Sequence, residues 1–142
     1  MSVIVDLNPV PTHLQVTLTG EYTLEGFKSA LVRIRQSADD YQSQKILIDC
    51  RGLAGNPSLR ERFEVVAFVL QQRITAILHG KPSKVATAIV ATPPLLHPGR
   101  YGIRLLIERN MNLTVCAEIE EALTWLGVET QARQPDSNPA SG

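Results

Sequence analysis

The sequence lacks most of the features that assign a function directly. Its 142 residues contain 14 Lys and Arg and 14 Asp and Glu. It therefore lacks the overall basic charge typical of nucleic-acid-binding proteins, and we expect no nucleic-acid partner. It has no run of about 18 apolar residues, the length that a membrane-spanning helix needs. Aromatic residues make up only 5% of the chain. These absences exclude whole classes of protein without pointing to one.

Few residues are suited to metal binding or catalysis. The two cysteines and three histidines are far apart in the sequence, and none has the spacing of a metal site or of a nucleophile with its base. The loop at 52–55 follows a predicted strand, but it matches no phosphate-binding motif. We therefore predict a non-enzymatic protein without a cofactor or a metal. An enzyme would need an acid, base or nucleophile pair that the sequence does not reveal.

The composition that is present is that of an ordinary globular protein. Hydrophobic residues make up 44% of the chain and charged residues 20%, which predicts a single domain with one well-covered core. The N-terminus carries Asp6 where a secretory signal peptide has basic residues, so we expect a cytoplasmic protein with Cys50 and Cys116 reduced. The domain is predicted at 1–127, followed by a polar, disordered tail at 128–142.

Hydrophobic periodicity predicts the secondary structure. Short alternating or continuous apolar runs predict strands at 3–7, 14–20, 45–50, 84–91 and 113–116. Apolar residues at steps of three and four predict helices at 24–38, 58–79, 98–110 and 118–126. These elements form an N-terminal antiparallel hairpin followed by three βα crossovers. The predicted fold is therefore α/β, with a mixed, mainly parallel sheet covered by helices.

The helix predicted at 58–79 is the longest. Ser58 and Glu61 have the spacing of a capping box, which predicts that the helix begins there. Its apolar face, which we expect to pack on the core, consists of Leu59, Phe63, Val66, Leu70, Ile74 and Ile77. Residues 65–70 are apolar on all sides of the helix. We therefore also expect part of the helix to contact another helix of the domain or a second subunit, as a homodimer.

This order of elements resembles the STAS domains, and in particular the SpoIIAA-like domains named after bacterial anti-sigma factor antagonists. Two segments carry the resemblance, which covers about residues 1–127: Ile-Leu-Ile-Asp-Cys-Arg-Gly-Leu at 46–53 and Glu-Glu-Ala-Leu-Thr-Trp-Leu at 120–126. The resemblance implies a bacterial regulatory module that binds another protein. Related SpoIIAA-like chains are often grouped with lipid-exchange domains.

The resemblance also implies a candidate phosphoacceptor. In the family, a partner kinase phosphorylates a serine at the start of the helix that follows the second core strand, and Ser58 matches this position. The family usually has Asp-Ser within a run of small residues that continues Ser-Gly-Leu. This chain has Asn56-Pro57-Ser58-Leu59-Arg60 instead. These departures lead us to expect that Ser58 is a helix cap and that the phosphoserine switch is absent.

Ligands and partners of open α/β sheets collect at the carboxyl ends of the parallel strands. Here those ends are the loops at 49–58 and 92–100. We predict a mouth for a partner or ligand, with three arginines and an apolar lip, formed by Asp49, Arg51, Asn56, Arg60, Leu95, Leu96 and Arg100. The alternative is that the arginines are ordinary solvated charges.

Two functions therefore remain for this sequence. The first is a regulatory module that binds a protein partner. The second is a carrier for a small apolar or lipid-like ligand, with the Pro-rich loop at 92–98 over its site. A pocket larger than about 300 Å³ behind Leu95 and Leu96 would favour the carrier.

Overall fold

A computed structural model describes residues 2–80 and 85–128. In chain order, its elements are β1 (Val3–Pro9), β2 (Leu14–Glu21), α1 (Leu24–Asp40), β3 (Lys45–Ala54), α2 (Leu59–Leu78), β4 (Ala86–Val90), α3 (Ile103–Glu108), β5 (Leu113–Cys116) and α4 (Ile119–Leu126). The strands form one sheet in the order β1-β2-β3-β4-β5. β1 is antiparallel to β2, and the remaining pairs are parallel. The predicted α/β fold is confirmed.

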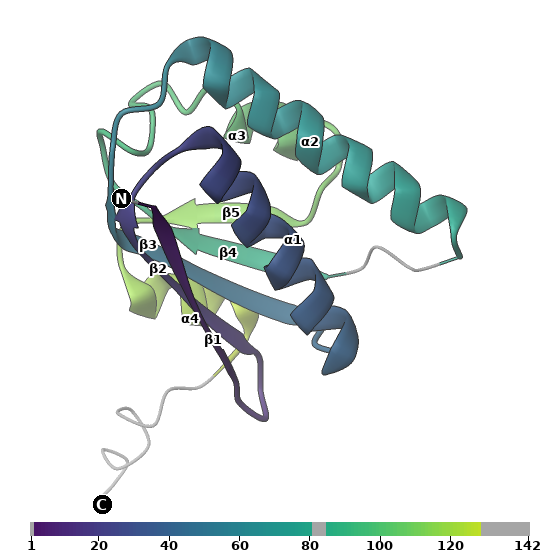
Figure 1. Ribbon diagram of the computed structural model, residues 1–142. Coiled ribbons are helices and arrows are strands. Elements are labelled where there is room, and N and C mark those ends of the chain that lie inside the picture. Colours follow the sequence, from purple (N-terminus) through teal and green to yellow (C-terminus); the bar gives the residue numbers. More distant parts are fainter. Residues whose placement is uncertain (1, 81–84, 129–142) are drawn as a thin grey trace, which may run out of the picture.

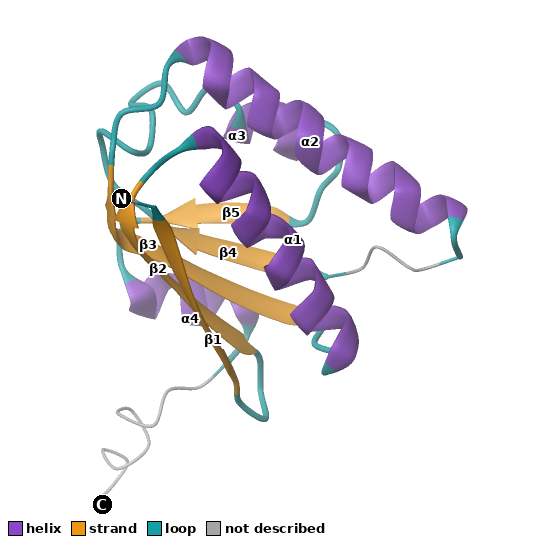
Figure 2. Cartoon of the chain, viewed as in Figure 1, coloured by secondary structure: helices purple, strands orange, loops and turns teal. Residues whose placement is uncertain are grey.

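The helices are distributed unevenly over the two faces of the sheet. α1, α2 and α3 lie on one face, and α4 lies on the other (Figures 1 and 2). Each of the first three helices connects neighbouring parallel strands in the same direction across the sheet. Because such crossovers share one hand, they place successive helices on the same face.

The sheet separates two apolar cores. Side chains alternate along a strand, so consecutive residues of β3 point to opposite cores. Ile48 contributes to the core under α1, together with Ile34 of that helix. Leu47 contributes to the other core, where α4 supplies Ala122 and Leu126. α4 is therefore the helix that covers the second face.

The face with three helices is too narrow to hold all of them side by side. Five strands about 4.8 Å apart form a sheet roughly 24 Å wide, whereas three helices about 10 Å in diameter need about 30 Å. α1 packs against β1 and α3 against β5, while α2 makes its main contacts with α1 and α3. Of the 20 residues of α2, Val66 and Ala76 are the buried ones. The helix therefore lies over its neighbours and away from the strands.

The predicted core face of α2 points mainly to solvent. Val66 is buried, but Leu59, Phe63, Ile74 and Ile77 expose 47%, 42%, 58% and 52% of their surface. The prediction was correct about the helix and wrong about what covers its apolar face. Periodicity reports that a helix has an apolar side, and the crowding of three helices on one face decides where that side points.

The strands are longer than predicted. β1 continues through Pro9, which pairs with Leu14; proline is tolerated there because β1 is an edge strand. β3 continues to Ala54, beyond the predicted strand at 45–50, because its last residues pair with Gly20 and Glu21 of β2. The main-chain groups of this segment therefore belong to the sheet.

Two boundaries in the C-terminal half also differ from the prediction. α3 begins at Ile103 instead of 98, because Arg100 and Gly102 have φ angles of 59° and 89°, which a right-handed helix excludes. Val128, the first residue of the predicted tail, instead belongs to the domain, because it is buried and its N–H donates to the carbonyl of Leu123. The remainder of the predicted tail, 129–142, lies outside the described residues.

Candidate functional site

Ser58, the candidate phosphoacceptor, caps α2. Its Oγ accepts a hydrogen bond of 3.1 Å from the N–H of Glu61, and Oε1 of Glu61 accepts one of 3.0 Å from the N–H of Ser58. The predicted capping box is thus present. The carboxylate of Glu61 already occupies the positive end of the helix, within one turn of the Ser58 hydroxyl.

Arg62, which no sequence motif marks as a site residue, joins the two loops at this end of the sheet. It donates to the carbonyls of Pro57 (3.0 Å), Leu95 (2.8 Å) and Pro94 (3.1 Å), and to Oδ1 of Asn56 (3.3 Å). The side chain therefore fixes the loop before α2 against the loop after β4. Its step of four residues to Val66, a predicted core residue, is the sequence signal that places Arg62 beside the core.

Asp49 and Arg51 lie on the α4 side of the sheet. Arg51 donates to Asp49 through Nε (2.9 Å) and Nη2 (3.0 Å). Burial raises the pKa of Asp49, but hydrogen bonds and charge from Arg51 outweigh burial and hold that pKa below its ordinary value. The charges of Glu118 and Glu120 also act on Arg51. Asp49 and Arg51 therefore satisfy each other's charge and hydrogen bonds on the α4 side of the sheet.

The other predicted mouth residues are divided between the two faces. Arg60 is exposed on α2, where its Nε lies 3.4 Å from the carboxylate of Glu64. Leu95 and Leu96 are half-buried against the core under α1. The exposed Arg100 acts electrostatically on Cys116, which packs against the core under α4.

The structure therefore separates Arg60 from Arg51, two of the three arginines of the predicted mouth. These side chains come from loops that meet at one edge of the sheet, but β3 turns Arg51 toward α4, while Arg60 belongs to the helix on the opposite face. Alternation along a strand, which sends neighbouring side chains to opposite faces, separates them.

A hollow of about 130 Å³ lies behind Leu95 and Leu96. Its walls come from the start of α1, from α2, α3, the sheet and the 92–102 loop, and include Tyr22, Phe27, Cys50, Arg62, Val66, Ile89, Leu106 and Val115. It is smaller than the roughly 300 Å³ typical of sites for drug-sized ligands. Burial raises the pKa of the Cys50 thiol to about 12, which disfavours the reactive thiolate form.

The hollow contains one polar group that stands out. The Tyr22 hydroxyl is buried and has no hydrogen-bond partner among the described residues. Burial is the main cause that raises its pKa to about 12, with a smaller contribution from Glu61. Buried hydroxyl groups without a partner are rare in folded proteins, because they lose the hydrogen bonds that water would supply.

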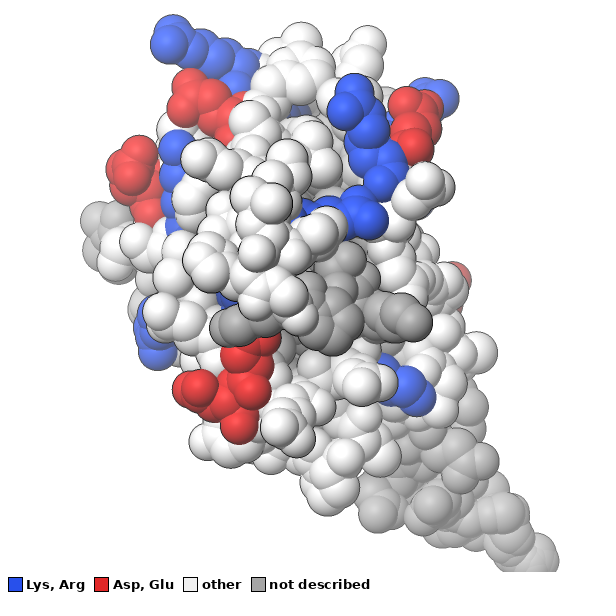
Figure 3. Space-filling model, turned by 90° about the vertical axis from the view of Figure 1, so that its right-hand side faces the viewer, with Lys and Arg blue, Asp and Glu red and all other residues white. Residues whose placement is uncertain are grey.

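The outer face of α2 carries a continuous apolar surface. We name as the outer stripe the six residues that lie within an arc of about 80° around the helix axis: Leu59, Phe63, Ala67, Leu70, Ile74 and Ile77. Phe63 also contacts the Tyr101 ring at 6.5 Å between centroids, and Tyr101 is 52% exposed. Figure 3 views the side at which α2 ends and shows a broad uncharged area between groups of acidic and basic side chains.

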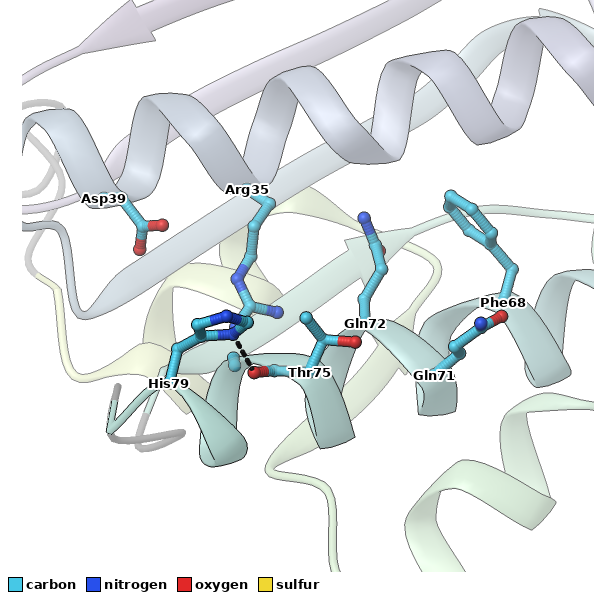
Figure 4. Close-up of a pocket in the computed structure, with 8 residues that line it drawn as sticks. Arg35, Asp39, Phe68, Gln71, Gln72, Thr75 and His79 are labelled. Carbon is cyan, nitrogen blue, oxygen red and sulfur yellow. Dashed lines mark hydrogen bonds between the residues drawn. The ribbon is translucent and has the colours of Figure 1, made fainter.

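The inner face of α2 diverges from α1 toward the end of the helix. A pocket of about 390 Å³ lies between Arg35 and Asp39 of α1 and the polar side of α2 (Figure 4). In that pocket, His79 Nδ1 lies 2.8 Å from the carbonyl of Thr75. Nearer the start of α1, Lys28 Nζ lies 5.6 Å from the ring centroid of Phe68, so Phe68 faces α1. The predicted contact of α2 with another helix of the domain is confirmed.

Within residues 2–80 and 85–128, no helix is long and apolar enough to cross a membrane. In the same ranges, no three His, Cys, Asp or Glu side chains come together as they would around a metal ion.

The sequence matches no protein-family model and no curated protein, but solved structures resemble the fold. One is an anti-sigma factor antagonist from Mycobacterium paratuberculosis, with a TM-score of 0.52, 14% identity, and coverage of 89% of this chain and 95% of that one. The second is an uncharacterized DUF3478-family protein with a SpoIIAA-like fold from Shewanella loihica, with a TM-score of 0.51, 19% identity, and coverage of 88% and 93%. This chain has a SpoIIAA-like fold. The resemblance predicted from the sequence is confirmed for the fold.

Proposed function

We propose that this protein is a non-enzymatic regulatory module that binds an amphipathic helix of a protein partner through the outer stripe of α2. The observation that carries the proposal is the exposure of 42–58% of Leu59, Phe63, Ile74 and Ile77. Isolated apolar residues on a surface are ordinary, but a contiguous apolar patch marks an interaction site. A narrow stripe along a helix suits a second helix, whose own apolar ridge packs against it.

The similarity to an anti-sigma factor antagonist supports a protein partner, because that solved structure is described as a protein that acts on another protein. We propose that phosphorylation of Ser58 does not regulate this binding. A phosphate on Ser58 would add about −1.5 to −2 charges beside the carboxylate of Glu61. The nearby cations are engaged, Arg60 by Glu64 and Arg62 by loop carbonyls. Neither arginine could bind the phosphate without losing these contacts.

The experiment that tests the proposal is affinity capture from the native host with three forms of the protein, followed by binding measurements on the purified partner. We expect Ile74→Arg to abolish binding, because it replaces the most exposed large apolar side chain of the stripe with a charge. Gln36→Arg adds the same charge on the exposed side of α1 and should bind as the unmodified chain does. Equal binding by both variants would contradict the proposal.

Two Ser58 variants and a mass measurement test whether phosphorylation of Ser58 regulates binding. Ser58→Ala should lower the free energy of unfolding by about 1 kcal/mol, the usual loss for a removed cap, whereas Ser58→Asp should retain most of the cap. Both variants should bind the partner normally. Intact-mass analysis of protein from its own host should show no phosphate. A stoichiometric phosphoserine at Ser58, or loss of binding in Ser58→Asp alone, would contradict this part of the proposal.

A second candidate function is the binding of a small, mainly apolar molecule in the hollow behind Leu95 and Leu96. The unpartnered Tyr22 hydroxyl favours it, because a ligand with one acceptor oxygen would satisfy that group. A volume of about 130 Å³ is too small for a lipid but close to the roughly 150 Å³ of cavities that hold benzene. Titration with phenol and acetophenone, followed by NMR, tests this candidate. Shifts that Leu106→Trp abolishes would support it, and no shifts at millimolar ligand would exclude it.

A further inference from the structure

We infer that the helix docked on the outer stripe is α2 of a second copy of this chain, packed antiparallel about a two-fold axis. This inference rests on the proposed function and names the partner of the same surface. It follows from the order of the residues in the stripe, from the charges beside it and from its size.

The outer stripe is nearly symmetric about the middle of α2. In an antiparallel pair with the axis near position 68, Leu59 faces Ile77 of the second copy and Phe63 faces Ile74. The small side chain of Ala67, which is exposed, faces Leu70. Each bulky residue thus meets an apolar residue, and the smallest one lies near the axis, where the two helices approach most closely. A two-fold interface requires a surface of this kind, which is complementary to itself.

The charges on the flank that carries Arg60 agree with the same arrangement. Arg60 and Glu64 lie on one flank, and the same flank carries Gln71 and Thr75 toward the other end of the helix. The two-fold axis brings this flank against its own copy in the opposite direction. Arg60 then lies opposite Thr75, and Glu64 opposite Gln71. No like charges oppose each other on this flank, and each charged group gains a neutral polar neighbour. On the opposite flank, Arg62 would lie across from Arg73 of the second copy, and both side chains donate to main-chain carbonyls of their own chain.

The size of the surface sets the expected strength of the dimer. The 20 residues of α2 span about 30 Å. Tyr101, which is 52% exposed, contacts Phe63 at the side of the stripe and widens the patch beyond the helix itself. The area buried is then roughly 500 Å² per chain, close to the lower limit of about 1,000 Å² in total for specific interfaces. We therefore expect a dissociation constant in the micromolar range.

Sedimentation equilibrium of the purified chain from about 1 to 200 μM tests this inference. The expected result is a reversible transition from the chain mass of 15.6 kDa to twice that mass. Ile74→Arg should raise the dissociation constant at least 100-fold, because symmetry places the new charge in the interface twice. The matched variant Gln36→Arg should leave the constant unchanged within about twofold.

Spin labels on single cysteines test the orientation. In a Cys116→Ser background, with the native Cys50 buried, labels at Ala67→Cys and Arg60→Cys are compared. Antiparallel packing sets the two copies of position 67 about 5 Å apart along the helix axis, and those of position 60 about 25 Å apart, at 1.5 Å per residue. Equally short distances at both positions would indicate parallel helices and overturn the arrangement.

The oligomeric state and the binding of Ile74→Arg together separate the dimer from the proposed function. A strict monomer at 200 μM overturns the second copy as the occupant. If Ile74→Arg still abolishes the binding of a different purified protein, the proposed function stands while the inference fails. If the chain is monomeric and Ile74→Arg changes no binding, both fail. A dimer that persists in Ile74→Arg places the interface elsewhere and also overturns the inference.

Discussion

The helices α1 and α2 lie on the same face of one sheet and have the same kind of apolar periodicity, but they bury it differently. α1 places Ala30, Ile34 and Ala38 in the core. α2 is three residues longer and buries Val66 and Ala76. The difference comes from position, since α1 lies directly on the strands, whereas α2 lies over α1 and α3. An amphipathic pattern therefore identifies an apolar side without identifying what it contacts.

The largest expected effect comes from the same truncation on each helix. Ile34→Ala should lower the free energy of unfolding by about 2–5 kcal/mol, because it leaves a cavity in the core. Ile74→Ala, at a position that is 58% exposed, should lower it by less than about 1 kcal/mol. Urea denaturation at submicromolar protein concentration, where dimers dissociate, measures both. Equal losses would mean that α2 packs as α1 does.

A smaller effect distinguishes the two arginines at the start of α2. Arg62→Ala removes four hydrogen bonds that join the loops and should cost about 1–3 kcal/mol, since carbonyls such as that of Leu95 lose their donor. Arg60→Ala removes only an exposed ion pair and should cost less than about 0.5 kcal/mol. Hydrogen exchange should also rise in the 92–100 loop of Arg62→Ala. If both variants lose the same free energy of unfolding, Arg62 does not hold the loops together.

The smallest effect concerns the α4 side of the sheet and depends on pH. Because the pKa of Asp49 is lower in the folded chain than in the unfolded one, its charge stabilises the fold above the ordinary pKa of about 4. This contribution is lost as the pH falls through the lower, folded value. Urea denaturation between pH 6 and pH 2.5 should show this loss in the unmodified chain. Asp49→Asn and Arg51→Ala should each reduce it, and an unchanged pH profile in both would refute the role of the pair.

The local features of the fold were predictable, since they depend on neighbouring residues. Alternation predicted β2, and the step of three from Ser58 to Glu61 predicted the cap of α2. The boundaries of β3 and α3 were missed because they depend on pairing with β2 and on the backbone angles of Arg100 and Gly102. Neither the pairing of β3 with β2 nor the backbone angles before α3 can be predicted from hydrophobic periodicity.

The candidate site was less predictable than the fold. Asp49 and Arg60 were named from loops that meet at one edge of the sheet, but the strand places Asp49 toward α4, and the helix places Arg60 on the other face. Arg62 was missed because a charge within an apolar helix suggests a solvated residue. Its partners are main-chain carbonyls from a loop about thirty residues away, which no sequence pattern specifies.

The position of α4 has a consequence for the way the chain is made. The core on that side joins Leu47 and Val90 of the sheet to Ala122 and Leu126. Synthesis proceeds from the N-terminus, so all five strands and the first three helices emerge before the helix that covers this face. Until then, the growing chain presents apolar strand residues to other proteins, and this is the period in which unfinished chains aggregate. The nascent domain therefore remains prone to aggregation until α4 has folded onto this face of the sheet.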